Sequence, residues 1–219
     1  MTTNPLIVVD LGHTLGHVVG RGAHPAEILK PLTPYGYHHR LVDEEVKRVL
    51  NVVPELHEEV VRQICDRLLI PVDEWPDPWQ PTTFEFYEDA HKVLRELNNI
   101  GPVVALTNQP VTAHAAMHYV AAECGSDLKE IFTSYNLGDY KPARWLWKYV
   151  ADHMRHKVSD IIHIGDQYTE DVLAPLSAGA LGAVWVHADA GDQVGNRWER
   201  VTLLRNTPDA VRRLLGTAA

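Results

Sequence analysis

Hydrophobic positions along the chain alternate between short continuous runs and longer stretches with a helical period. Apolar runs predict buried strands at residues 6–9, 103–106, 161–164 and 183–186, with a weaker one at residues 131–134. Apolar residues that recur every three or four positions predict helices at residues 86–99, 111–124, 142–153, 170–178 and 208–215. This alternation of strands and helices indicates an α/β fold, with a Rossmann-like parallel sheet flanked by helices.

A different pattern fills the region between the first strand and residue 86. It holds helical patterns at residues 42–52 and 54–69 and no good strand. A glycine-containing stretch at residues 16–22 precedes these patterns, and a stretch rich in proline and tryptophan at residues 71–81 follows them. We therefore predict a core domain made of residues 1–16 and 86–219, and a smaller helical cap made of residues 17–85.

Composition limits the classes of function. The 219 residues suffice for one core domain with an insert. A net charge of −9 disfavours nucleic acid as a partner. No apolar run approaches the roughly 20 residues of a membrane span, so we predict no membrane partner. Residues 1–5 lack a basic-then-apolar signal pattern, which favours a cytoplasmic location. A monomer and a homodimer are both compatible with the sequence.

Polar residues follow three of the predicted strands. Asp10 ends the first, Thr107 and Asn108 follow the second, and Asp166 follows the third. The carboxyl ends of parallel strands meet at one edge of a sheet, where open α/β folds bind ligands. An acid at a strand end is also a common turn-former or helix cap, so Asp10 alone does not identify a site.

Four motifs taken in chain order carry a family resemblance. They are Asp10-Leu-Gly-His-Thr14, Thr107-Asn108, Lys141-Pro142 and Gly165-Asp166-Gln-Tyr-Thr-Glu-Asp171. This series resembles the haloacid dehalogenase (HAD) superfamily of aspartate-nucleophile hydrolases, and the resemblance covers nearly the whole chain. Each motif alone is weak, and four in order at plausible spacing are specific.

The resemblance implies a role for each motif residue. Asp10 is expected to be the nucleophile that forms a covalent intermediate. Thr107 and Lys141 are expected to be catalytic groups that bind the transferring phosphoryl oxygens, and Asn108 is expected to help bind the substrate. The expected substrate is a small phosphorylated molecule.

A divalent cation is also implied, because an acidic nucleophile and a phosphate dianion repel each other. Mg²⁺ prefers an octahedron of oxygen ligands. The family resemblance assigns these to Asp10, Asp166, Asp171 and the backbone carbonyl of Gly12. Asp171 has the alternative role of orienting Lys141 or a metal-bound water.

Gly12 is the departure from the family pattern. Most members carry a second Asp there, which serves as general acid and base, a contribution of about 10² to 10⁴ in rate. Three solutions are open: the leaving group departs without a proton, another residue such as His13 supplies it, or the substrate is not a phosphate ester. Strict alternation from Asp10 predicts that the His13 side chain points away from the side that Gly12 faces.

Three alternatives to a phosphatase stay open. Family members that cleave carbon–halogen or carbon–phosphorus bonds, the haloacid dehalogenases and phosphonatases, also lack the second Asp. The Gly165 to Asp171 motif disfavours a dehalogenase, since dehalogenases work without metal. The third alternative is a non-catalytic protein that binds phosphate and Mg²⁺ in the same pocket.

Overall fold

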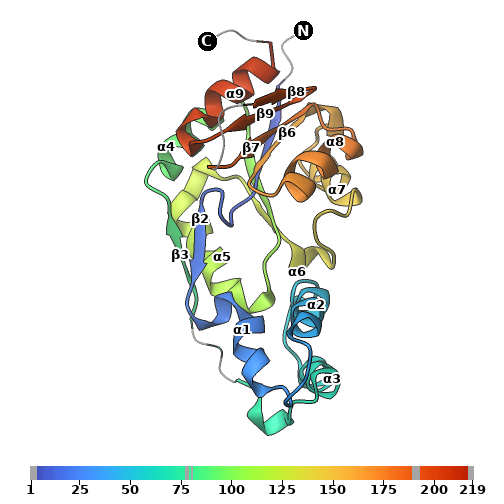
Figure 1. The fold of residues 1–219 in the computed structure, drawn as a ribbon. Helices are drawn as coiled ribbons and strands as arrows, with labels where there is room; N and C mark the ends of the chain where they lie inside the picture. The colour runs from blue at the N-terminus through green and yellow to red at the C-terminus, as the bar shows by residue number, and fades with distance from the viewer. Residues whose placement is uncertain (1–3, 77–78, 80, 189–192, 217–219) are drawn as a thin grey trace.

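A seven-stranded sheet forms the centre of the protein (Figure 1). The structure is a computed structural model that describes residues 4–76, 79, 81–188 and 193–216. The strand order is β5-β4-β1-β6-β7-β9-β8, and every neighbouring pair is parallel except β8 with β9. The strands are β1 (Leu6–Val9), β4 (Val103–Thr107), β5 (Ile131–Thr133), β6 (Ile161–Gly165), β7 (Gly182–Val186), β8 (Gln193–Gly195) and β9 (Trp198–Val201). The predicted α/β class is confirmed.

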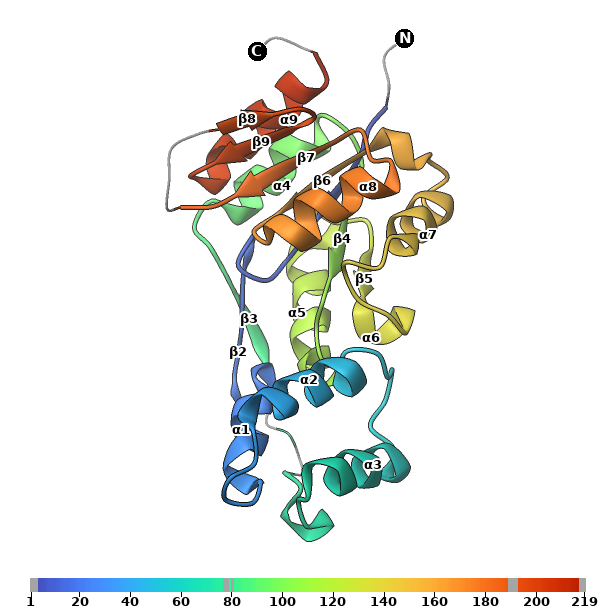
Figure 2. The same ribbon diagram turned by 45° about the vertical axis from the view of Figure 1, so that its right-hand side comes forward.

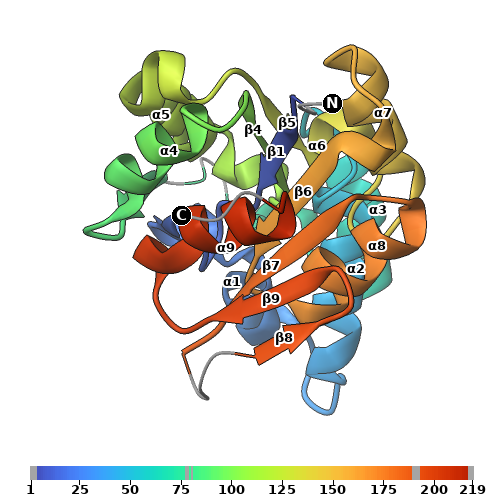
Figure 3. The same ribbon diagram turned by 90° about the horizontal axis from the view of Figure 1, so that it is seen from above.

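Helices cover both faces of this sheet, because alternate residues of each strand face opposite sides. In β1, Ile7 and Val9 pack in the cluster of α4 (Ala90–Asn98), α5 (His114–Cys124) and α9 (Thr207–Leu214). Leu6 and Val8 pack instead against α7 (Trp145–His153) and α8 (Ala174–Ala178). Figure 3 shows the sheet between these two helical layers.

A separate antiparallel ribbon leads from the core to three helices. It consists of β2 (Gly16–Val19) and β3 (Thr83–Phe86), paired from Gly16 opposite Phe86 to Val19 opposite Thr83. Beyond it lie α1 (Pro25–Leu29), α2 (His39–Leu50) and α3 (Glu58–Leu68), at the end of the molecule away from α9 (Figure 2). These helices bury a hydrophobic cluster of their own.

The ribbon corrects two predictions. The absence of a strand between β1 and residue 86 was wrong, and so was a helix start at residue 86, since Phe86 ends β3 and α4 begins at Ala90. Residues Thr83 to Phe86 alternate polar and aromatic side chains, which is a strand period. Gly16 is part of this pairing: a Cβ there would lie 2.1 Å from the Glu85 carbonyl oxygen.

Strands β8 and β9 were not predicted, because their sequence lacks an apolar run. Glu199 in β9 is buried and accepts hydrogen bonds from Arg213 in α9 at 2.7 and 2.9 Å. Helix starts also differ from prediction, and those expected at residues 42, 54 and 111 lie at His39, Glu58 and His114. The helix expected from residue 142 begins at Trp145, and the one expected from residue 170 is the π-helical turn η7 (Tyr168–Leu173) followed by α8.

The cap helices and the ribbon pack differently. Val18 and Phe84 of the ribbon belong to the core's hydrophobic cluster, whereas α1, α2 and α3 form the separate one. The division into residues 1–16 and 86–219 against 17–85 remains an interpretation, and residues 1–3, 77–78, 80, 189–192 and 217–219 lie outside the described part of the chain. No helix among the described residues has the length and apolar character that a bilayer crossing requires.

Candidate active site

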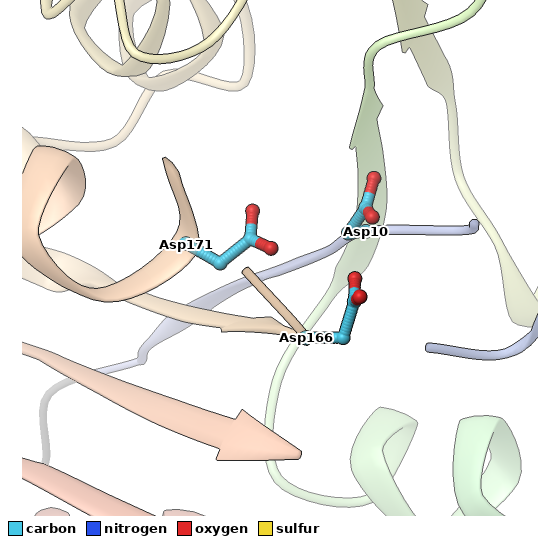
Figure 4. A group of neighbouring side chains, drawn as sticks. All are labelled: Asp10, Asp166 and Asp171. Atoms are coloured by element: carbon cyan, nitrogen blue, oxygen red, sulfur yellow. The ribbon is translucent and has the colours of Figure 1, made fainter. Parts of the chain in front are cut away.

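The carboxyl ends of β1, β4 and β6 lie next to one another, because β1 is hydrogen-bonded between the other two. Asp10 follows β1, and its backbone N–H donates to the Ile164 carbonyl of β6 at 2.8 Å. Asp166 follows β6, and Asp171 lies in the π-helical turn η7. One carboxylate oxygen from each of these three acids lies within 4.8 Å of the others. Figure 4 shows the three side chains gathered beside one another. The sequence motifs therefore meet at one edge of the sheet.

Lys141 is the buried cation of this group. Its Nζ lies 3.0 Å from Asp10 Oδ1 and 2.6 Å from Asp171 Oδ1, and the lysine is 1% exposed. Burial alone would lower the pKa of Lys141, but the charges of Asp10 and Asp171 outweigh that effect and raise it. Lys141 is therefore a fixed positive charge beside the expected nucleophile.

Asp10 and Asp171 respond differently to burial. Burial raises the pKa of Asp10 to about 7, although the Lys141 charge opposes the shift. For Asp171 burial acts in the same direction, but the Lys141 charge and the hydrogen bond from His163 prevail and lower its pKa. Asp171 therefore stays ionised and paired with Lys141. The ionisation of Asp10 depends on whether a cation or a substrate is bound beside it.

A buried hydrogen-bonded chain holds Asp171 in place, and the sequence analysis did not find it. Trp147 Nε1–H donates to His163 Nδ1 at 3.2 Å, which leaves the proton of a neutral imidazole on Nε2. His163 Nε2–H then donates to Asp171 Oδ1 at 3.0 Å, and burial lowers the pKa of His163, which keeps it neutral. The available signal was His163 itself, a polar residue within an otherwise apolar strand.

The second oxygen of Asp171 is held by the backbone. Asp171 Oδ2 accepts the Gln167 N–H at 2.9 Å. The neighbouring strand makes room for this carboxylate, because a Cβ on Gly165 would lie 2.3 Å from Asp171 Cγ. Both Asp171 oxygens are therefore occupied by protein donors, which favours its predicted role of orienting Lys141.

Asp166 is less enclosed. Its Oδ2 accepts a hydrogen bond from Gln167 Nε2 at 2.7 Å, and Trp185 Nε1–H donates to its backbone carbonyl at 2.8 Å. Burial raises the pKa of the Asp166 carboxyl, with the Gln167 hydrogen bond opposing the shift. Of the three clustered acids, Asp10 and Asp166 line the cavity.

Asn108 positions the loop that carries Lys141. Its Oδ1 accepts the Lys141 backbone N–H at 2.8 Å, and its Nδ2 donates to the Lys141 carbonyl at 3.1 Å and to Glu170 Oε2 at 2.8 Å. This side chain lines the site, but its polar atoms are engaged with the protein. Its predicted role in binding the substrate stays a prediction.

A cavity of about 250 Å³ opens onto these residues. Asp10, Lys141, Asp166 and Gly12 line it, together with Gln109, which the sequence analysis missed. Thr107 is buried and accepts a hydrogen bond from Gln109 Nε2 at 3.4 Å, but it is not among the described lining residues. Its contact with a phosphoryl oxygen therefore stays a prediction.

Three histidines border the same cavity: His13, His17 and His24. The prediction that His13 points away from the site was wrong, because its backbone leaves the extended conformation. His13 has a φ of 58°, which breaks the strand alternation directly after Asp10. His13 is exposed and remains a candidate proton donor.

Comparisons with known proteins agree with the fold. The family model for haloacid dehalogenase-like hydrolases matches residues 79–179. The structure of a 2-haloacid dehalogenase from Pseudomonas syringae pv. tomato DC3000 is similar at 16% identity, with a TM-score of 0.64 and coverage of 95% of this chain and 98% of that one. No curated protein matches the chain significantly.

Two further similar structures carry other descriptions. A HAD phosphatase from Thermococcus onnurineus is 14% identical, with a TM-score of 0.56 and coverage of 98% and 99% of the two chains. The HAD-hydrolase YfnB from Bacillus subtilis, bound to magnesium, is 16% identical, with a TM-score of 0.57 and coverage of 97% and 99%. At these identities the structures show the shared fold. Together with the family match, which covers residues 79–179, they support a hydrolytic enzyme that is similar to the HAD superfamily.

Proposed function

We propose that this protein is a Mg²⁺-dependent phosphohydrolase that acts on a small organic phosphate through a covalent intermediate on Asp10. The observation that carries the proposal is the pairing of Asp10 with the buried Lys141, 3.0 Å away, beside the partly exposed Asp166. A nucleophilic carboxylate, a fixed cation and a second acid open to the cavity are the parts that phosphoryl transfer needs.

The donor set fits a divalent cation. Three carboxylates face one lysine, so the site carries excess negative charge when all of them are ionised. Asp10 Oδ1 is buried and accepts no directed hydrogen bond from the described residues, although Lys141 lies within ion-pair distance. Asp10, Asp166 and the Gly12 carbonyl would hold Mg²⁺, which supplies charge neutralisation for the phosphate. Asp171 would support this set through Lys141.

The chain's own residues account for the first displacement. Asp10 attacks phosphorus, and Lys141 stabilises the negative charge on the phosphoryl oxygens and keeps Asp10 oriented. The neutral chain of Trp147 and His163 keeps Asp171 against Lys141. The cap would limit the access of water until the covalent intermediate has formed.

The second candidate function is that of a dehalogenase or a phosphonatase. The charged residues that line the cavity disfavour the dehalogenase. A haloacid brings a carboxylate that needs a cationic partner. Among the described residues that line the cavity, none is an arginine, and the one lysine, Lys141, is already paired with two acids. The three histidines of the cavity offer a positive charge only when they are protonated. The cavity suits a substrate whose charge is balanced by an added cation better than a free haloacid.

A substrate screen on the wild type and Asp10→Asn tests the proposal. The substrates are acetyl phosphate, p-nitrophenyl phosphate and 2-chloropropionate, each with Mg²⁺ or with EDTA. We expect Mg²⁺-dependent release of phosphate, lowered by at least about 10³-fold in Asp10→Asn. The matched control is Asp73→Asn, an exposed acid in the cap, which should keep wild-type activity.

Each other outcome points to an alternative. Halide release that needs Asp10 but no Mg²⁺ would replace the phosphatase by a dehalogenase. Phosphate binding in calorimetry without turnover of any ester would identify a non-catalytic binding protein.

A further inference from the structure

A side chain from the loop after β4 lies opposite Gly12. Gln109, two residues beyond β4, is 8% exposed, and its Nε2 would lie 3.4 Å from a Cβ built on Gly12. This distance is an ordinary van der Waals contact between the Gln109 amide and a side chain at position 12. The amide of Gln109 therefore lies beside the position at which most family members carry the second Asp.

The backbone of Gln109 is held firmly. Its N–H donates to Ser134 Oγ at 3.0 Å, and the Ser134 hydroxyl donates to the Gln109 carbonyl, also at 3.0 Å. Ser134 is itself buried, at the start of α6 (Ser134–Leu137). This pair of contacts fixes the direction in which the Gln109 side chain leaves the backbone, toward the cavity.

The amide has unused hydrogen-bonding capacity. A glutamine side chain has two N–H donors and one carbonyl acceptor. Its side-chain hydrogen bond within the described part of the chain runs from Nε2 to Thr107 Oγ1, at 3.4 Å, which is long. Since Gln109 lines the cavity beside Asp10, an N–H remains for a bound molecule.

We propose that Gln109 contacts the leaving group and sets the specificity of the site for phosphates whose leaving oxygen is a stabilised anion. This inference rests on the proposed function. An amide N–H stabilises a developing oxyanion but does not transfer a proton, whereas a carboxylic acid does both. The substrate class is that of acyl, enol and aryl phosphates, and alkyl phosphates are poor substrates.

The steps balance without a proton donor. An Asp10 oxygen forms a bond to phosphorus, the bond from phosphorus to the leaving oxygen breaks, and the electron pair stays on that oxygen. Water then bonds to phosphorus, the bond from Asp10 to phosphorus breaks, and both water protons remain with the phosphate. Gln109 donates its hydrogen bond in the first step, where negative charge develops on the leaving oxygen.

A leaving-group series tests this role. We measure kcat/KM with Mg²⁺ for acetyl, p-nitrophenyl, phenyl and glycerol phosphate, in order of increasing basicity of the leaving oxygen. Gln109→Met keeps the length of the side chain and removes the donor. We expect a small effect with acetyl phosphate and a loss of about 10²-fold with phenyl phosphate, the size seen when one oxyanion donor is removed. The control is Gln63→Met, an exposed position in α3.

A second variant keeps the test decisive if Gln109→Met folds poorly. Gln109→Glu places a carboxyl group at the same site, so it should shift the preference toward phenyl and glycerol phosphate at acidic pH. Thermal unfolding of each variant separates a folding defect from a change in preference.

Two failures are distinguishable. If the wild type hydrolyses these phosphates in an Asp10-dependent way, but both Gln109 variants change every substrate equally or none, the leaving-group role is wrong and the proposed function stands. If the wild type hydrolyses none of the four, the proposed function and this inference are both wrong.

Discussion

At the scale of single residues, the charge of the site depends on one buried lysine that pairs with two carboxylates. Lys141 lies between Asp10 and Asp171, and the hydrogen bond from His163 gives Asp171 the firmer hold on it. A buried ion pair is costly to break but contributes little net stability, because both charges lose their hydration. We therefore interpret the arrangement as a device for keeping Asp10 reactive and not as a source of stability.

The raised pKa of Asp10 leads to a prediction on stability. Since its folded-state pKa of about 7 exceeds its ordinary value, proton binding by Asp10 stabilises the fold fully below the ordinary pKa, and this contribution is lost as the pH rises through about 7. Asn cannot ionise. Without metal, Asp10→Asn should be more stable than the wild type, and the difference should grow by about 2 kcal/mol between about pH 5.5 and about pH 8.

Urea unfolding in EDTA at the two pH values measures this difference. Mg²⁺ should stabilise the wild type and reduce the gap, because the cation takes the place of the proton beside Asp10. A gap that is the same at both pH values would show that Asp10 is not destabilised by its burial.

At the scale of elements, the strand ends and the π-helical turn η7 position the chemistry. The turn brings Asp171 back over the end of β6, and Gly165 leaves the space for its carboxylate. π-helical turns are rare and often occur at functional sites. The geometry of the site thus depends on one strand residue that has no side chain.

Gly165→Ala tests that dependence. The added Cβ would displace Asp171 from Lys141, so we expect a loss of stability of about 1–3 kcal/mol, the range for overpacking, and a loss of most of the proposed phosphatase activity. Gly182→Ala on the neighbouring β7 is the matched control, since its Cβ would meet Arg197 and Leu214 at 3.2 Å, away from the site. It should lose stability and keep its activity. Equal kcat/KM in the two variants would contradict the role of Gly165.

The sequence predicted the elements whose signal is local. Five strands of the sheet and most helices follow from apolar period, and Asp10, Lys141, Asp166 and Asp171 follow from motifs in order. Strand β9 was not predicted, because its buried Glu199 is paired with Arg213 and no local sequence pattern reveals that contact. Gln109 and His163 were not predicted for the same reason, because their contacts with Gly12 and Asp171 join segments that are not consecutive in the sequence.

At the scale of the whole molecule, the cap contacts the core next to the site. Lys47 in α2 lies 3.1 Å from Glu170 Oε1, and its ammonium lies 4.9 Å from the centre of the Tyr140 ring. Glu170 also accepts the hydrogen bond from Asn108, which holds the Lys141 loop. This contact links the position of the cap to the site that it covers.

Lys47→Gln should weaken the contact between cap and core with little effect on the free energy of unfolding. The pair is partly exposed, so its loss should change the free energy of unfolding by no more than about 1 kcal/mol. We expect KM for acetyl phosphate to rise several-fold with a smaller change in kcat, because the closed position of the cap is weakened. Lys92→Gln, whose partner Glu96 lies on the same helix α4, is the control. If the two variants have the same KM, the contact does not control closure.

The proposed mechanism requires a covalent intermediate at Asp10. A single turnover of acetyl phosphate in ¹⁸O-labelled water, quenched in acid and analysed by peptide mass spectrometry, tests it most directly. We predict one phosphoryl group on the peptide that contains Asp10, and labelled oxygen in the released phosphate but not in the Asp10 carboxylate. Turnover without the phosphorylated peptide, or label in the Asp10 carboxylate, would contradict the account.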